Sequence, residues 1–393
     1  MRRIASPGIL LLLLLGGLAL GCQGKQKKAD TENSMAKKQP PPGIETSFFG
    51  HFPAGGQVMR YRLRNANGME VDILNYGGII TRWTAPDRNG NYQDVVIGFD
   101  RMAPYLQRHP YFGALIGRYG NRIAKGTFTL EGNTYSLARN NGENHLHGGE
   151  NGFDRVLWEA QNETRGDTLI LHLDYLSPDG EEGYPGNLKT RVTYRLAPDN
   201  TLVVDYQATT DAPTVVNLTQ HTYFNLSGDF TRDITDHELT LDAPAYLPVD
   251  DGLIPTGEQR PVVGTPFDFT AAKAIGRDID AEDPQLGVGG GYDHCWVLRE
   301  DRDISNAAAT AYHPESGRVL EVLTEEPGIQ VYTSNFLDGS LPAKGGGYYP
   351  FRAGLCLETQ HFPDSPNRPE FPSTRLDPGQ TYHTRTSFRF STR

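Results

Sequence analysis

The sequence predicts an all-β protein in which antiparallel sheets pack as a sandwich or barrel. After residue 45 no segment keeps a helical hydrophobic period, whereas short alternating or β-branched runs recur. The 44 Gly and 27 Pro residues are too many for a helical chain and suit many strands joined by turns. Turn signals separate the strand-like runs at close spacing, which is typical of a large antiparallel β-sandwich.

The elements follow from these signals in chain order. Strands are expected over 70–74, 94–97, 168–173 and 382–390. Two hairpins are expected, one joining 127–130 to 134–137 and one joining 191–196 to 202–206, because Gly132-Asn133 and Pro198-Asp199-Asn200 are turn sequences. Short helical turns are expected near 102–106 and 271–275. No change of composition divides residues 45–393, so they are predicted to form a single domain.

The first 44 residues are of a different kind. Arg2 and Arg3 precede an apolar run over 9–20, which is shorter than the ~20 residues of a membrane-spanning helix and matches an export signal. Leu18-Ala19-Leu20-Gly21-Cys22 resembles a bacterial lipobox, although Ala19 and Leu20 stand in swapped order. We therefore expect an export signal over 1–21 and lipidation of Cys22, with an ordinary cleaved secretory signal as the alternative.

Residues 22–44 are polar, rich in lysine and end in three prolines, so they are predicted to be an extended tether. The resulting expectation is an exported bacterial lipoprotein, whose domain lies in the periplasm or outside the cell and whose only membrane contact is the lipid anchor.

Charge excludes some partners. Residues 1–44 carry a net charge of +5, and subtracting it from the chain's −11 leaves −16 for the remainder. Such an acidic domain repels nucleic acids, and it disfavours phosphorylated substrates as well. Besides Cys22, Cys295 and Cys356 lie in apolar runs typical of buried thiols; whether they form a disulfide stays open.

Histidines mark the first candidate site. His147 is followed by two glycines that would permit close approach of a ligand, and His145 two residues earlier would share its face on a strand. The His-x-His pair resembles half of a metal site, but no third ligand stands at a fitting spacing, so no metal is predicted. A purely structural histidine remains the alternative.

Two ionisable residues lie within apolar runs. His221 follows Val215-Val216 and precedes Tyr223-Phe224, and a partly buried imidazole is suited to general acid catalysis. Glu358 follows the core-like Leu355-Cys356-Leu357, where a carboxylate must be paired or functional. A structural salt bridge is the alternative for Glu358, and Asp293 has the same ambiguity.

Taken together, several segments resemble the aldose 1-epimerase (galactose mutarotase) family over residues 50–391. The matching segments are Gly117-Arg118-Tyr119-Gly120-Asn121-Arg122-Ile123, Asn144 to Phe153, Asn217 to Leu226, Gly291-Tyr292-Asp293-His294, Gly328 to Phe336 and Cys356-Leu357-Glu358-Thr359-Gln360. The resemblance implies the β-sandwich called a supersandwich. It also implies that His221 is the proton donor and Glu358 the proton acceptor. Further, it implies that the sugar is bound by Asn121, Arg122, His147, Tyr223, Asp293 and Gln330.

The implied activity is the interconversion of α and β anomers of free aldohexoses such as glucose and galactose, without cofactor or metal, by a monomer or homodimer. Acid and base are expected to give a bell-shaped pH profile, with its acidic limb from Glu358 and its alkaline limb from His221. A non-catalytic sugar-binding lipoprotein, a hexose-6-phosphate epimerase and a polysaccharide-processing enzyme are the alternatives.

Overall fold

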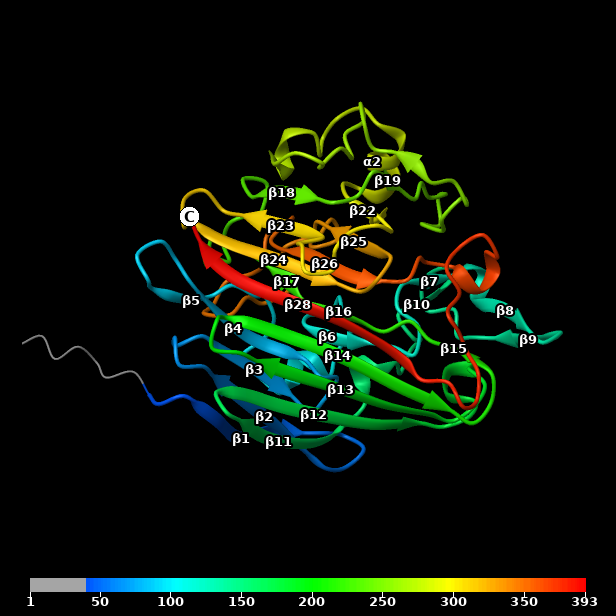
Figure 1. The fold of residues 1–393 in the computed structure, drawn as a ribbon, viewed down its shortest axis with the longest axis horizontal. Coiled ribbons are helices and arrows are strands. Elements are labelled where there is room, and N and C mark those ends of the chain that lie inside the picture. The colour runs from blue at the N-terminus through cyan, green and yellow to red at the C-terminus, as the bar shows by residue number, and fades with distance from the viewer. Residues whose placement is uncertain (1–39) are drawn as a thin grey trace, which may run out of the picture. The chain divides into compact units, whose positions relative to one another are not determined.

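The computed structural model describes residues 40–393, and three antiparallel sheets hold most of their strands (Figure 1). The nine-stranded sheet has the order β11 (Glu159–Arg165), β12 (Thr168–Ser177), β13 (Leu188–Leu196), β14 (Thr201–Thr210), β28 (Tyr382–Thr392), β24 (Arg318–Thr324), β23 (Ala309–Tyr312), β18 (Glu238–Leu241) and β21 (Lys273–Ala274). Its central strand is the C-terminal one, β28, which pairs with β14 and β24.

Two further sheets accompany it. The five-stranded sheet has the order β1 (Gly43–His51), β2 (Gln57–Arg64), β3 (Glu70–Leu74), β4 (Ile80–Pro86) and β5 (Tyr92–Asp94). The six-stranded sheet has the order β17 (Tyr223–Phe224), β26 (Leu355–Gln360), β25 (Gly328–Tyr332), β22 (Asp293–Val297), β19 (Ala245–Tyr246) and β20 (Arg260–Pro261). In Figure 1 the long strands of the nine-stranded sheet cross in front of both.

Short elements complete the chain. Four two-stranded pairs are β6 (Ala114–Ile116) with β16 (Thr219–His221), β7 (Arg122–Ile123) with β10 (His145–Leu146), β8 (Thr127–Leu130) with β9 (Asn133–Ser136), and β15 (Thr214–Val215) with β27 (Arg375–Leu376). The helices are α1 (Met102–Tyr105) and α2 (Pro284–Gly289), and single 3₁₀ turns cover 124–126, 153–155, 181–183, 275–277 and 365–367. Within residues 40–393 neither helix has the length and apolar composition that crossing a bilayer would require.

One large hydrophobic core joins the three sheets. Alternate residues of β13, such as Leu188 and Val192, point inward while Lys189 and Arg191 face solvent. The same buried cluster contains Val71 of β3 and Leu357 of β26, so the nine-stranded sheet packs on both others.

Trp83 of β4 marks the junction of the three sheets. Its ring centroid lies 5.6 Å from that of Phe224 in β17 and 5.7 and 5.5 Å from those of Phe388 and Phe390 in β28. The indole is fully buried, and aromatic rings at such distances add attraction beyond the burial of their area. Side chains from all three sheets therefore meet at this point.

The predicted antiparallel β-sandwich is confirmed. Both predicted hairpins are present as β8–β9 and β13–β14, and the strands at 70–74, 168–173 and 382–390 are present as β3, β12 and β28. The helical turn near 102–106 is α1. The prediction of a helical turn over 271–275 is wrong. Lys273–Ala274 forms strand β21, which pairs with β18, and the helical turn begins only at residue 275.

The strand predicted over 94–97 is shorter in the structure: β5 ends at Asp94, and Val96 forms only an isolated bridge to Phe224. The short helix α2 precedes Asp293, and Asp283 caps it by accepting a hydrogen bond from the Gln285 N–H. The export signal of 1–21 and the lipidated Cys22 lie outside the described residues.

Candidate active site

The candidate site begins with one face of the six-stranded sheet. Cross-strand partners share a face, and the register pairs Gln330 with Glu358 and Tyr332 with both Asp293 and Cys356. The intervening residues, including Val331 and Leu357, point to the other face and belong to the hydrophobic core. Alternation along β22, β25 and β26 therefore gathers the polar side chains on the face that does not pack against the core.

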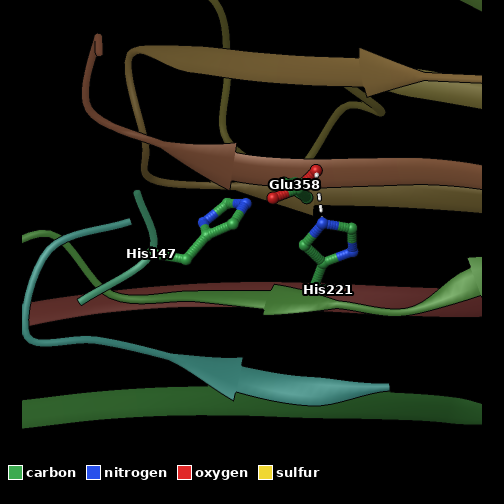
Figure 2. A group of neighbouring side chains, drawn as sticks. All are labelled: His147, His221 and Glu358. Atoms are coloured by element: carbon green, nitrogen blue, oxygen red, sulfur yellow. Dashed lines mark ion pairs between the residues drawn. The ribbon is translucent and has the colours of Figure 1, made fainter. Parts of the chain in front are cut away.

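His221 approaches this face from another strand pair. It ends β16, whose partner is β6, and its Nε2 lies 3.6 Å from Oε1 of Glu358. Figure 2 shows the ring pointing from its strand towards the carboxylate on β26. The rings of Tyr223 and Tyr111 lie nearly parallel to the imidazole, with centroids 4.9 and 5.8 Å away. Both members of the pair are buried, with side chains 5% and 2% exposed.

His147 completes the cluster from a turn. Its backbone has φ 51, and its Nδ1 accepts a hydrogen bond of 3.1 Å from the Asn121 N–H. A neutral imidazole whose Nδ1 is an acceptor carries its proton on Nε2. The ring centroid lies 5.1 Å from that of His221 with the two ring planes at 76°, and Figure 2 shows the two rings as neighbours beside Glu358. His147 is therefore prepared to donate a hydrogen bond.

These side chains border a cavity of about 140 Å³. It is lined by Pro110, Tyr111, Arg122, Asn141, Leu146, His147, His221, Tyr223, Asp293, Tyr332 and Phe336. Glu358 and Gln330 contact the lining residues: Glu358 faces His221, and Gln330 Nε2 donates to Asp293 Oδ1 at 2.7 Å. Glu358 Oε2 and Gln330 Oε1 are buried and accept no hydrogen bond from residues 40–393, so each keeps an unused acceptor beside the lining residues.

All eight predicted sugar-site and catalytic residues gather here. Asn121 takes part mainly through its backbone, whose N–H donates to His147. Its side-chain Oδ1 is already occupied, because it accepts a hydrogen bond of 2.9 Å from the Arg122 N–H. Arg122 Nε donates to Asn141 at 3.0 Å, which orients the guanidinium. Sequence reasoning missed Tyr111, Asn141, Tyr332 and Phe336. Of these only Tyr332 and Phe336 had a signal, since they lie in the family-like segment from Gly328.

His145 does not pair with His147. It lies on β10, where its Nδ1 is 2.7 Å from the Ala138 carbonyl and its Nε2 is 2.6 Å from the Tyr184 hydroxyl. The positive φ of His147 ends the alternation that would place both rings on one face. The predicted close approach at Gly148 is real but serves the fold, because a Cβ there would collide with the Gly117 carbonyl oxygen.

Ligand atoms of His147, His221 and Glu358 come close enough together to resemble a metal site. The Nδ1 lone pair of His147, however, accepts the Asn121 N–H, and its Nε2 carries the proton. The arrangement therefore suits hydrogen bonding better than metal coordination.

A second cluster, Asp236, His237 and His313, has the same property. The Leu226 N–H donates to Nε2 of His237, and the Ser316 N–H donates to Nδ1 of His313. The other nitrogen of each ring therefore carries the proton, and both of these nitrogens face Asp236.

Burial sets the protonation of the catalytic pair. It lowers the pKa of His221 to about 3 and raises the pKa of Glu358 well above its ordinary value, and the negative charge of Asp293 raises that of Glu358 further. Burial also lowers the pKa of His147 well below the usual range and raises that of Asp293. Burial thus disfavours the charged form of both groups, so a proton shared by the pair is favoured on the carboxyl rather than on the imidazole. These directions are opposite to the predicted origin of the two pH limbs, which stays a prediction for a measured pH profile.

In this site a buried carboxyl and a buried imidazole share one proton, beside hydrogen-bonding groups that line a cavity of an antiparallel sandwich. This combination defines an acid–base enzyme for small polar substrates. The family model for aldose 1-epimerase matches residues 59–389. Galactose mutarotases of Sus scrofa and Homo sapiens are 48% and 46% identical over 349 and 348 residues, which is 88% of this chain and 98% of each relative. Aldose 1-epimerase of Escherichia coli K12 is 38% identical over 340 residues, or 86% of this chain and 96% of that protein.

Solved structures agree. A GalM/aldose epimerase homologue from C. elegans superposes with a TM-score of 0.77 at 30% identity, covering 88% of this chain and 99% of that one. Galactose 1-epimerase from Lactobacillus acidophilus gives 0.78 at 27% identity, with 89% and 99% covered. The chain belongs to the aldose 1-epimerase family, and it is an isomerase that interconverts the anomers of sugars.

Proposed function

We propose that the cavity binds a free aldohexose such as glucose or galactose and that His221 and Glu358 open and reclose its ring. Opening breaks the bond between C1 and the ring oxygen. His221 Nε2 gives a proton to the ring oxygen while Glu358 takes the proton of the C1 hydroxyl. The observation that carries this proposal is the distance of 3.6 Å between Nε2 and Oε1 in a site where both side chains are buried.

The single shared proton is what the reaction needs. In the empty cavity it lies on Glu358, because burial raises the pKa of that carboxyl and lowers that of His221. A bound C1 hydroxyl that donates to the carboxyl favours its ionised form. The proton then passes to His221, and the imidazolium donates it to the ring oxygen. Rotation about C1–C2 and the reverse transfers give the other anomer.

The remaining groups hold the sugar's other hydroxyls. Arg122 and Asp293 make charge-assisted hydrogen bonds of opposite polarity, and the Nε2–H of His147 donates. Gln330 fixes one oxygen of Asp293 and so leaves the other for the substrate. Asn121 holds His147, and the ring of Tyr223 supports the imidazole of His221. No group here requires a metal or an organic cofactor.

The rival activities lack such support. A hexose-6-phosphate epimerase would need several cationic side chains for the phosphate. Within residues 40–393, Arg122 is the only such side chain that lines the cavity. A protein that only binds sugar does not need a buried carboxyl and imidazole that exchange a proton. A role in hexose metabolism follows from the anomer exchange itself.

We also propose that the chain is exported and anchored through a lipid on Cys22. The lipobox-like sequence before Cys22 and the lysine- and proline-rich tether that follows it support this. The enzyme would then act as a monomer or homodimer beyond the cytoplasmic membrane.

Polarimetry on freshly dissolved α-glucose and α-galactose tests the activity. Glu358→Gln should fold and bind sugar while turnover falls by about 10²–10⁴-fold, since one general base is lost. The exposed Glu282→Gln is the matched control and should keep full activity. If Glu358→Gln keeps more than about a tenth of the activity, Glu358 is not the base.

A further inference from the structure

Both nitrogens of the His221 ring face a side chain of the same strand. Nε2 lies 3.6 Å from Glu358 Oε1, and Nδ1 lies 3.6 Å from the sulfur of Cys356. Cys356 precedes Glu358 by two residues on β26, so both point to the same face of the sheet, ~7 Å apart along the strand. The imidazole is inserted between them. Cys356 is fully buried and forms no disulfide.

The proposed reaction places a demand on Nδ1. A ring that gives and takes its proton at Nε2 must keep a proton on Nδ1 in both states, because a neutral imidazole carries one proton and an imidazolium two. A buried N–H without an acceptor is costly, so the neutral ring would otherwise move its proton to Nε2, towards Glu358. An acceptor at Nδ1 is therefore required, and the sulfur of Cys356 lies at the sulfur hydrogen-bond distance.

We propose that Cys356 is a positioning residue whose sulfur accepts the Nδ1–H of His221 and thereby assigns Nε2 to proton exchange with the sugar. This inference rests on the proposed acid role of His221. Sulfur is a weak acceptor, which explains the choice of a thiol. A carboxylate in its place would stabilise the imidazolium and hold the proton, as the aspartate of a catalytic triad does. A neutral thiol orients the ring without making it a stronger base.

The burial of the thiol agrees with this assignment. It raises the pKa of Cys356 well above its ordinary value and so favours the neutral sulfur. With the shared proton on Glu358, the Nε2 lone pair faces the carboxyl, which places the ring proton on Nδ1 and towards the sulfur. Glu358 and Cys356 thus fix the same tautomer from opposite ends of the ring.

Three variants and one spectrum test the proposal. Cys356→Ala removes the acceptor and should lower kcat by about 10- to 100-fold with KM little changed, which is less than the ~10⁴-fold cost of losing a triad aspartate because sulfur is the weaker partner. Cys356→Ser restores an acceptor and should recover most of kcat. Cys295→Ala removes the other buried thiol, which does not contact His221, and should leave kcat unchanged.

The ¹⁵N spectrum of imidazole-labelled protein near neutral pH reads the tautomer without any activity. His221 should carry its proton on Nδ1 in the wild type and in Cys356→Ser, and on Nε2 in Cys356→Ala. A wild-type ring protonated on Nε2 overturns the proposal, as does a folded Cys356→Ala enzyme with wild-type kcat. If Cys356→Ala does not fold, the wild-type spectrum and the serine variant decide.

The proposed function fails separately. Should His221→Asn keep wild-type turnover, His221 is not the acid whatever its tautomer. Loss of turnover in His221→Asn together with full turnover in Cys356→Ala would refute only the inference about the thiol.

Discussion

The pH dependence of turnover should respond in opposite directions to two charges near Glu358. The alkaline limb of kcat/KM reports the loss of the last proton from the Glu358–His221 pair in the free enzyme. Asp293 raises the pKa of Glu358 and Arg122 lowers it, after the larger effect of burial. Asp293→Asn should therefore move the alkaline limb to lower pH, and Arg122→Met should move it to higher pH.

The size of the shift follows from the sheet. Asp293 on β22 and Glu358 on β26 are separated by β25, which is about two strand spacings, or ~9.5 Å. The register also offsets them by two residues, or ~7 Å along the strands, so they lie ~12 Å apart. Two charges at this distance interact by about 1.4 kcal/mol at an effective dielectric constant of ~20, which corresponds to about one pKa unit. On the limb, Asp293→Asn should consequently lose about tenfold more activity than at the plateau.

The assay is polarimetry of α-galactose or α-glucose between pH 6 and 10, with the spontaneous rotation subtracted at each pH. Both residues line the cavity, so the height of each profile will fall as well; the position of the limb carries the information. The exposed Asp251→Asn is the matched control and should leave the limb in place. The reasoning is refuted if both variants keep the wild-type limb or if both shift it in the same direction.

Two predictions remain. Burial lowers the pKa of His237 and of His313, so each ring is neutral in the fold and binds protons more readily when unfolded. Their contribution to stability is complete above an unfolded pKa of ~6.5 and is lost as the pH falls, so urea should unfold the protein more easily at pH 5.5 than at 7.5. His313→Gln should weaken that dependence, and equal stability at both pH values would contradict it. Mass spectrometry of protein from a membrane fraction should find a lipid on Cys22, and Cys22→Ser should release the protein in soluble form; an unmodified Cys22 within a mature chain, or cleavage elsewhere, would rule out the anchor.

Most of the fold could be read from local patterns. Alternation predicted the strands β13 and β28. The turn sequences Gly132-Asn133 and Pro198-Asp199-Asn200 predicted the hairpins β8–β9 and β13–β14, because side-chain direction and turn type depend on neighbouring residues. The failure at 271–275 has a tertiary cause: Lys273 pairs with Leu239, 34 positions earlier, and no local signal reports that partner.

The candidate site divides in the same way. The motifs identified His221, Glu358 and the residues around them as a group, through their family resemblance. They gave no sign of Tyr111 or Asn141, which reach the cavity from loops. Alternation also predicted that His145 and His147 share one face of a strand, whereas the positive φ at His147 turns the two rings apart.

The sequence alone determined the sheet architecture and the acidic charge, because these depend on residue type and short-range period. His221 and Glu358 were proposed as the catalytic pair through the family resemblance of their segments. Tertiary structure decided which group holds the proton and which nitrogen exchanges it. A pKa depends on burial and on charges brought from distant strands, and a tautomer depends on the single atom facing each nitrogen. Neither is defined until the strands β16 and β26 have met.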